Sequence, residues 1–276
     1  MSSPTPDAPP ETGRLTDRLP PALQRAWHLL HRQDLALLAV LVVVAGGAWG
    51  VVALGDAVTG DEVITVDERI LLAFREAGDP NDPIGPHAVE SAVRDVTALG
   101  SVTVIGFLTL ATIGFFALSR RPYMATFVLF AIVGGVIVSY ALKFTYDRTR
   151  PSIIPPEMLP GDPSFPSGHS AAAAVAYLTL GVLLARTLPQ RRLKVYVVGL
   201  AALLAIAVGV SRVYLGVHWP TDVLAGWTIG AGWALLCWAA ERSLQRRGLV
   251  ERSVTVRRSR PTPAPSPPRR GPTAPD

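Results

Sequence analysis

The sequence predicts an all-α fold, a polytopic membrane bundle of six transmembrane helices with both termini in the cytoplasm. Hydrophobic residues make up 49% of the chain and charged residues only 17%, and the charged residues avoid six long stretches. Such segregation is typical of membrane proteins rather than of soluble domains. The uneven distribution of Lys and Arg among the connecting segments gives the orientation.

Six windows without Asp, Glu, Lys or Arg are the candidate spans. An apolar helix needs about 20 residues to cross the hydrocarbon core, with about 17 as the lower bound. All six windows reach that bound, the last two narrowly, because Arg212 and Asp222 lie beside them. A helix can continue past such residues where they line a polar pocket. The windows are 35–55, 96–119, 122–142, 163–185, 195–211 and 223–240.

The chain divides into three parts. Residues 1–33 form an N-terminal tail with no apolar run, unlike a cleaved signal peptide. Residues 34–240 hold the six spans, with a core at about 96–240 that carries the motifs described below. Residues 241–276 are basic and rich in Pro and Arg, so we expect a disordered cytoplasmic tail. The single cysteine, Cys237, excludes an intramolecular disulfide.

The basic residues define the predicted orientation. With six spans, the connecting segments alternate between the two sides, and 19 of the 26 Lys and Arg residues fall on the side of the termini. The positive-inside rule places that side in the cytoplasm. A net charge of +5 could also indicate nucleic-acid binding. No basic helix or aromatic platform accompanies the charge, so we predict no nucleic-acid partner.

The first outward loop, residues 59–95, is acidic and contains the turn-rich run GDPNDPIGP. An interfacial helix that covers the bundle would explain its apolar spacing, and a substrate lid is the alternative. The apolar residues spaced like one face of a helix are Val63, Ile64, Val66, Ile70, Leu71 and Phe74.

Three polar clusters lie at the outer ends of spans three to six, where polar side chains need partners or a function. They are KFTYDRTRP at 143–151, SFPSGHSAAAA at 164–174 and SRVYLGVHWPTD at 211–222. The topology, derived without reference to the clusters, places all three on one side of the membrane. We therefore expect them to form one site.

The cationic residues of these clusters predict a phosphate site. Lys143, Arg150 and Arg212 would repel each other unless a polyanion lay among them. Arginine suits bidentate contact with phosphate, and lysine acts as a point charge. The PSGH turn leads into an alanine-rich helix whose first N–H groups form an anion site, with Ser167 as the N-cap. Gly168 lets the backbone approach the anion closely.

Two histidines supply the chemistry. His218 and Asp222 are four residues apart, so in helical geometry they share a face and the carboxylate can orient the imidazole. The other ring nitrogen is then free to act as the nucleophile. His169 is the candidate general acid that protonates the leaving oxygen.

Each cluster alone has a simpler explanation. Lys143, Arg148 and Arg150 could extend to the headgroups. PSGH could be an ordinary helix start, and His218 an ordinary interfacial histidine. Trp219 fits the aromatic belt of a membrane protein. The three clusters in this order, on one face, are much harder to explain by topology alone.

Together the clusters resemble the type 2 phosphatidic acid phosphatase superfamily, which includes membrane lipid phosphatases and soluble vanadium haloperoxidases. That family's pattern is K-x6-RP, then PSGH, then SR-x5-H-x3-D, and every motif position is matched over residues 96–240. The resemblance implies a six-helix membrane bundle and catalysis without a metal or other cofactor. It also implies that His218 is the nucleophile, Asp222 its orienting partner and His169 the general acid. The phosphate-binding residues that it implies are Lys143, Arg150, Ser167, Gly168 and Arg212.

The expected function is hydrolysis of a lipid phosphate monoester or diphosphate at the extracytoplasmic face of the cell membrane, through a phosphohistidine. Phosphatidic acid, phosphatidylglycerophosphate and a polyprenyl diphosphate are the candidate substrates, and the sequence does not separate them. A phosphotransferase that uses the same phosphohistidine, and a membrane protein that binds lipid phosphate without cleaving it, are the alternatives. Vanadate-dependent peroxidation is disfavoured by the membrane spans. The oligomeric state stays open.

Overall fold

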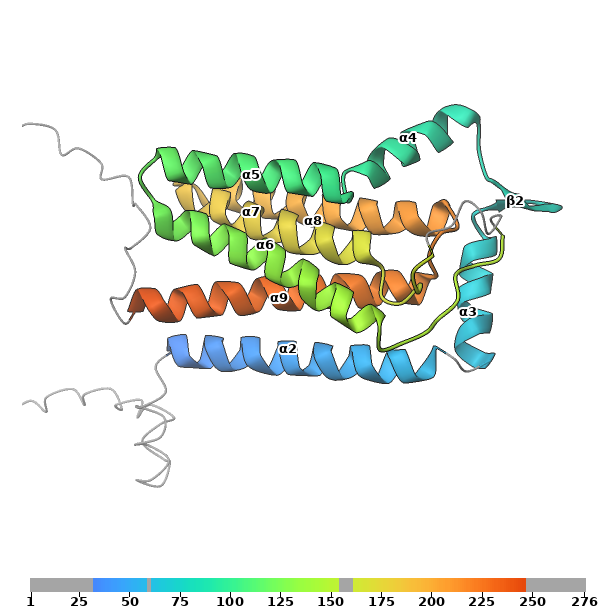
Figure 1. Cartoon of the computed structure of the whole chain (residues 1–276), viewed down its shortest axis with the longest axis horizontal. Helices are drawn as coiled ribbons and strands as arrows, with labels where there is room; N and C mark the ends of the chain where they lie inside the picture. Colours follow the sequence, from blue (N-terminus) through green and yellow to red (C-terminus); the bar gives the residue numbers. More distant parts are fainter. Residues whose placement is uncertain (1–31, 59–60, 154–160, 247–276) are drawn as a thin grey trace, which may run out of the picture.

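The computed structural model describes residues 32–58, 61–153 and 161–246, which form a bundle of long helices with short elements across one end (Figure 1). The long helices are α2 (Arg32–Ala57), α5 (Val102–Leu118), α6 (Pro122–Lys143), α7 (Gly168–Thr187), α8 (Arg191–Tyr214) and α9 (Pro220–Arg246). The short elements are α3 (Asp61–Leu72), the strands β1 (Arg75–Glu76) and β2 (Asp79–Pro83), and α4 (His87–Ala98). The two strands pair antiparallel, with Arg75 opposite Pro83. The predicted all-α membrane bundle is confirmed.

The predicted second span, window 96–119, covers α5 and only the last three residues of α4, so most of α4 lies in the segment 59–95 that the sequence predicts as a loop. Within the described residues, five helices are long and apolar enough to cross a membrane, and α4 with α5 makes a sixth if the pair is one span. The two helices meet at an angle of 45°. Ser101 starts α5 as its N-cap, and its hydroxyl oxygen accepts the Val104 N–H at 3.2 Å. Five of the six predicted windows therefore match single helices, and the second matches α5 with the end of α4.

The helix boundaries differ from the windows at the fourth span. Window 163–185 begins five residues before α7, because Pro163 and Pro166 hold the preceding segment out of helical geometry and α7 begins only at Gly168. Helices α8 and α9 do continue through Arg212 and Asp222, as expected. Most of the two predicted tails lies outside the described residues, and the domain boundaries stay predictions.

Glycines on α9 bring that helix close to the start of α7. A Cβ at Gly226 would lie 2.7 Å from the carbonyl oxygen of Ser167, and one at Gly230 would lie 2.6 Å from that of Ala171. Contacts this short leave no room for a side chain, and small residues let helix backbones approach in membranes. The packing fixes the first turn of α9 against the PSGH turn.

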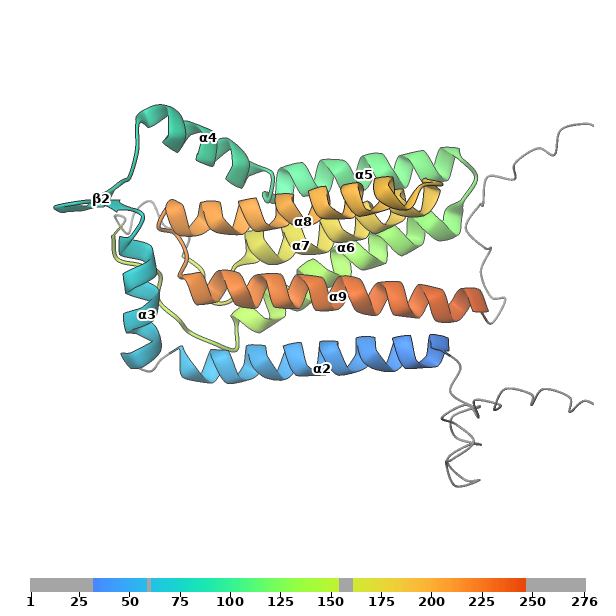
Figure 2. The same ribbon diagram turned by 180° about the vertical axis from the view of Figure 1, so that it is seen from behind.

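The outer loop contains a helix, as the apolar spacing predicted. Helix α3 lies across the end of the bundle and packs against the start of α9 (Figures 1 and 2). Leu71 is buried against Val213 and Val223. Val66 and Ile70 are 53% and 43% exposed, so only part of the predicted apolar face is buried. Its proposed roles, as an interfacial cover or a lid, stay predictions.

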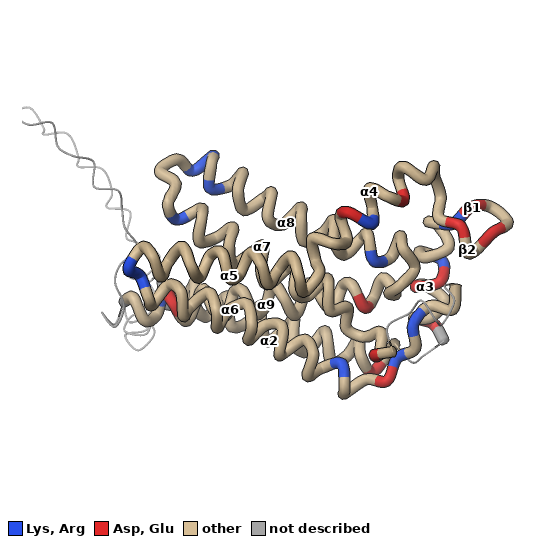
Figure 3. Tube along the Cα trace, turned by 45° about the horizontal axis from the view of Figure 1, so that its top comes forward, with Lys and Arg blue, Asp and Glu red and all other residues tan. Residues whose placement is uncertain are grey.

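One end of the bundle is mainly basic, whereas the other carries most of the acidic residues together with basic ones (Figure 3). Lys and Arg lie on the α5–α6 and α7–α8 connections, whereas acidic residues gather around α3, β1 and β2 at the other end (Figure 3). The three motif clusters lie at this acidic end. The arrangement agrees with the charge pattern behind the predicted orientation, which itself stays a prediction.

Candidate active site

The three motif clusters meet at one cavity. Its volume is about 420 Å³, and helices α5, α6, α7 and α8 contribute to its wall. Six of the eight predicted site residues line it, and Ser167 and Asp222 are not among its lining residues. The predicted residues in the wall are Lys143, Arg150, Gly168, His169, Arg212 and His218.

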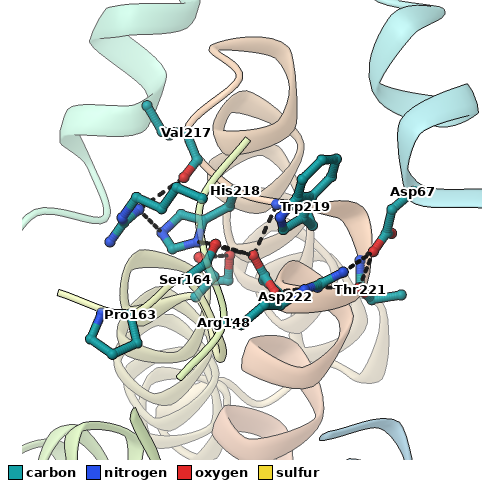
Figure 4. Close-up of polar contacts among 12 residues, drawn as sticks. Asp67, Arg148, Pro163, Ser164, Val217, His218, Trp219, Thr221 and Asp222 are labelled. Atoms are coloured by element: carbon teal, nitrogen blue, oxygen red, sulfur yellow. Dashed lines mark hydrogen bonds and ion pairs between the residues drawn. The ribbon is translucent and has the colours of Figure 1, made fainter. Parts of the chain in front are cut away.

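His218 is buried in the turn between α8 and α9, and both of its ring nitrogens have polar neighbours (Figure 4). Nε2 lies 3.1 Å from Nη1 of Arg150, which can only donate, so Nε2 accepts and the ring proton sits on Nδ1. Nδ1 lies 3.4 Å from both the Ser164 hydroxyl and Oδ2 of Asp222. Burial lowers the pKa of His218 to about 4, although the Asp222 hydrogen bond and charge oppose it. The imidazole is therefore neutral at neutral pH.

Asp222, in the first turn of α9, is completely buried, and both of its carboxylate oxygens accept hydrogen bonds. Oδ2 accepts the Ser164 hydroxyl and, at 2.9 Å, the Trp219 N–H. Oδ1 accepts Nη1 of Arg148 at 2.6 Å. The separation of 3.4 Å between Asp222 and His218 exceeds the usual N–H···O range. The Ser164 hydroxyl lies within 3.4 Å of both side chains and so connects Nδ1 of His218 to Oδ2 of Asp222.

A carboxylate occupies the space between two of the predicted phosphate-binding cations. Asp162 forms an ion pair with Lys143 through Oδ2 and accepts Nη2 of Arg150 at 2.8 Å through Oδ1. Burial acts to raise the pKa of Asp162, but the hydrogen bond from Lys143 and the charges of Lys143 and Arg150 outweigh it and hold that pKa below its usual value. Asp162 is thus an ionised partner of the cations.

Arg212 enters the cavity from the last turn of α8. Its Nη1 donates to the Thr97 hydroxyl of α4 at 3.2 Å, which ties the short outer helix to the site. Its Nε is buried and has no hydrogen-bond partner within the described residues. A buried guanidinium with an unused donor is suited to receive an anionic ligand.

The PSGH turn adds backbone groups to the site. Ser167 is the N-cap of α7, as predicted, but its side chain makes no capping hydrogen bond. Its hydroxyl accepts from Ser170 at 2.9 Å, and its N–H donates to the backbone oxygen of Asp222 at 3.0 Å. Gly168 lines the cavity, and a Cβ there would lie 3.7 Å from Cε of Lys143. Ser167 therefore connects α7 to α9, and the phosphate contact expected of it stays a prediction.

Four polar residues close to the predicted site are absent from the sequence analysis as site residues: Asp67, Arg148, Asp162 and Ser164. Arg148 and Ser164 lie inside the quoted motifs, but the sequence predicts no part in the site for either, and for Arg148 only an extension to the headgroups. Asp67 had a detectable signal, because it interrupts the apolar face of α3 four residues after Val63 and four before Leu71. Asp162 had none beyond its nearness to PSGH.

No metal centre is defined by the described part of the chain. Nowhere in residues 32–58, 61–153 and 161–246 do three or more His, Cys, Asp or Glu side chains gather in a group that could hold a metal ion. The groups that could hold an anion here are the cations and the first turn of α7.

This fold and this cavity define a multi-span membrane protein with a cluster of cationic and histidine side chains at one end. The sequence profile of the PAP2 superfamily matches residues 124–246. The chain is 30% identical over 135 residues to decaprenylphosphoryl-5-phosphoribose phosphatase of Mycobacterium tuberculosis, a match that covers 46% of this chain and 67% of that protein. The chain belongs to the PAP2 superfamily.

Two further relatives place the chain within this family. Phosphatidylglycerophosphatase B of Bacillus subtilis is 36% identical over 114 residues, which cover 40% of this chain and 55% of that protein. The crystal structure of a transmembrane PAP2-type phosphatidylglycerolphosphate phosphatase from Bacillus subtilis superposes with a TM-score of 0.66 at 27% identity, over 74% of this chain and 98% of that one. The chain spans about half the length of several curated relatives that it matches.

Proposed function

We propose that this protein is a membrane phosphatase that hydrolyses a lipid phosphate monoester or diphosphate at the extracytoplasmic face, through a phosphohistidine on His218. The observation that carries the proposal is one cavity lined by the neutral imidazole of His218, by His169 and by three cationic side chains. Phosphoryl transfer needs mainly alignment and neutralisation of charge, and this cavity offers both. The names of the relatives, which are phosphatases of lipid substrates, support the same reaction.

Substrate binding rearranges the resting contacts. A phosphate group carries more charge than the Asp162 carboxylate and replaces it as the partner of Lys143 and Arg150. Arg150 then turns from Nε2 of His218 to a phosphate oxygen, which frees the lone pair of that nitrogen. The unused Nε of Arg212 and the first-turn N–H groups of α7 supply further donors.

The reaction proceeds in two displacements. His169 takes up a proton when the negatively charged phosphate binds beside it. Nε2 of His218 then attacks phosphorus, the bond between phosphorus and the lipid oxygen breaks, and His169 gives that proton to the oxygen. Asp222 stabilises the positive imidazole ring through Nδ1–H. In the second step His169 takes a proton from water, the resulting oxygen attacks phosphorus, and the phosphorus–nitrogen bond breaks to release phosphate and neutral His218.

An apolar groove supports a lipid as the substrate. The cavity continues from the cations along α5 and α6 as far as Ile113 and Leu129. Lys143 and Leu129, both on α6, are about 20 Å apart along the helix axis at about 1.5 Å per residue. Such a groove accommodates an acyl or prenyl chain, with the phosphate at its cationic end. The remaining lining of the groove is mostly aliphatic, with Ile105, Leu110, Ile132, Val133, Val136 and Ile137 among its residues.

The direct test measures phosphate release from phosphatidic acid, phosphatidylglycerophosphate and a polyprenyl diphosphate by the purified protein in detergent, beside His218→Ala. We expect release by the wild type, an acid-labile phosphoenzyme, and loss of both in the variant. Equal release by the two proteins would refute the mechanism. With an acceptor alcohol present, a phosphorylated acceptor formed at the expense of free phosphate would identify a transferase instead.

The lipid part of the proposal has its own test. Gly106 lines the groove with no atom within 4 Å of an added Cβ, so Gly106→Phe should fill the groove without disturbing the fold. We expect a KM for the lipid raised about tenfold, with turnover of a short water-soluble phosphate ester unchanged. Gly114→Phe, on the same helix with equal free space but outside the groove, is the control. An equal effect of both substitutions on lipid and soluble substrates would contradict a tail site in this groove.

A further inference from the structure

A buried arginine connects the His218–Asp222 pair to the outer helix α3. Arg148 is 7% exposed and donates Nη1 to Oδ1 of Asp222 at 2.6 Å and Nη2 to Oδ2 of Asp67 at 2.7 Å. Its guanidinium carbon lies 5.4 Å from the centre of the Trp219 ring. The two Nη groups of Arg148 therefore bind one carboxylate each, and the Trp219 ring lies against its guanidinium. The side chain connects the two carboxylates (Figure 4).

Asp67 is completely buried, although its helix lies at the end of the bundle. Its Oδ1 accepts the Thr221 N–H at 3.0 Å, and its Oδ2 accepts the Thr221 hydroxyl as well as Arg148. Thr221 is the residue before Asp222, so Asp67 is connected to Asp222 by two routes, through the backbone of α9 and through Arg148. A helix that only covered the bundle would present an apolar residue at this position, because burying a carboxylate is costly unless it is fully paired.

The charges of this cluster explain why two carboxylates share one guanidinium. In the resting state Arg148 is balanced by Asp67 and Asp222, while the imidazole of His218 is neutral. One carboxylate is thus in excess. When His218 bonds to phosphorus its ring becomes a cation, and the excess negative charge then balances it inside a poorly solvated cluster. Without Asp67, Arg148 alone would neutralise Asp222, and the imidazolium would lack a counter-charge.

We propose that Asp67 is a positioning residue of the active site, which acts through Arg148 and Thr221 to hold the Asp222 carboxylate beside His218 and to keep it available for the imidazolium. The inference rests on the proposed phosphohistidine mechanism. It assigns α3 a part in the reaction itself, in addition to covering the bundle.

The first experiment substitutes Asp67→Asn, which keeps the shape of the side chain and removes its charge. The negative charge of Asp67 stabilises the site only when the His218 ring becomes charged. We therefore expect kcat for lipid phosphate to fall about 10- to 100-fold while KM stays within about twofold. Glu68→Gln, an exposed acid on the next position of α3, makes the same charge change and should leave kcat unchanged. An unchanged kcat in Asp67→Asn, or equal losses in the two variants, would overturn the inference.

The second experiment tests the route through Asp222. In an Asp222→Asn background, Asp67→Asn should lower the residual kcat less than about twofold, since the group that it positions is gone. Arg148→Lys keeps the charge but cannot bridge both carboxylates. It should therefore lower kcat in the wild-type background and change it less than about twofold in the Asp222→Asn background. Equal fractional losses in both backgrounds would overturn the inference, because Asp67 would then act on something other than Asp222.

The melting temperature in detergent is measured for every variant, to show that it folds. If Asp67→Asn does not fold, Arg148→Lys carries the comparison, and failure of both to fold would overturn the inference, because the pair would serve the fold alone. The outcomes also separate the two proposals. An inactive wild type rejects the proposed function, whereas an active wild type with an equally active Asp67→Asn variant rejects only the role of Asp67.

Discussion

The imidazole of His218 is fixed by what each nitrogen meets. Arg150 donates to Nε2, and the Ser164 hydroxyl and Asp222 lie beside Nδ1, so one tautomer is favoured and the ring cannot turn over. The nitrogen that faces Arg150 and the cavity is the one with a lone pair. Burial keeps the ring neutral, which is the form that a nucleophile needs.

The lowered pKa of His218 predicts a loss of stability in acid. The folded pKa of about 4 lies below the ordinary value of 6.5, so the unfolded chain takes up this proton first as the pH falls. The contribution of the neutral ring is complete above pH 6.5 and decreases as the pH falls toward 4, by on the order of 2 kcal/mol between pH 7 and pH 5. Melting in detergent should therefore show a larger drop between pH 7 and pH 5 for the wild type than for His218→Gln. Identical drops would contradict a buried neutral ring.

Asp162 predicts competition at the phosphate site. Its carboxylate already pairs with Lys143 and Arg150, so Asp162→Asn should make these cations more available to a phosphate analogue. We expect the inhibition constant of vanadate to fall about tenfold. Asp147→Asn, an exposed acid of the same segment, is the control. An unchanged or higher constant would mean that Asp162 supports the anion site and does not compete for it.

Most of the predicted site residues lie at the ends of helices and few lie in helix interiors. The PSGH turn leads into α7, Asp222 lies in the first turn of α9, Arg212 lies in the last turn of α8, and His218 follows that helix. Local sequence carries strong signals at such places, through Pro, Gly and capping residues, and this is why the motifs could be assigned to one site before any coordinates. The capping signal at Ser167 gave the start of α7 correctly, whereas the charge-free window began five residues too early, because absence of charge cannot separate an extended segment from a helix.

The residues that sequence analysis did not identify depend on contacts between distant segments. Asp67 meets Arg148 and Thr221 across 81 and 154 positions of the chain. Asp162 contacts Arg150 twelve positions away, a separation that no helical or strand period relates. Periodicity and spacing report neighbours along one helix, so they could mark Asp67 as unusual on an apolar face but could not name its partner.

The close approach of α9 to α7 makes a prediction about two glycines. Gly226→Ala places a methyl group 2.7 Å from a backbone oxygen that cannot move aside freely, so the first turns of α7 and α9 must separate. We expect a loss of stability of about 1–3 kcal/mol, seen as a lower melting temperature, with a fall in kcat. Gly232→Ala, on the same helix with nothing within 4 Å, should leave both unchanged. Equal behaviour of the two variants would show that the contact is not needed.

Considered as a whole, the molecule has two chemically different ends. The described end of α9 lies beside the start of α2, at the end with the basic connections, and the site lies at the opposite, acidic end (Figures 1 and 3). Charge in the short connections is the usual determinant of orientation in a membrane. We therefore expect the basic end in the cytoplasm and the site outside it.

Orientation can be measured with a reporter enzyme that is active only outside the cytoplasm. Inserted at Gly78, an exposed position between β1 and β2, the reporter should be active in a bacterial host. Fused to the C-terminus, it should be inactive, because six spans bring both ends of the chain to one side. The opposite pair of results would reverse the predicted topology and place the site in the cytoplasm.

The hydrogen bond from Arg150 to Nε2 of His218 has a consequence for selectivity. While the guanidinium occupies that lone pair, the ring is a poor nucleophile toward any electrophile that diffuses past it. In the proposed mechanism only a molecule with enough negative charge draws Arg150 away, so recognition and activation become a single event. An uncharged lipid of matching length could fill the groove and still leave the histidine inert.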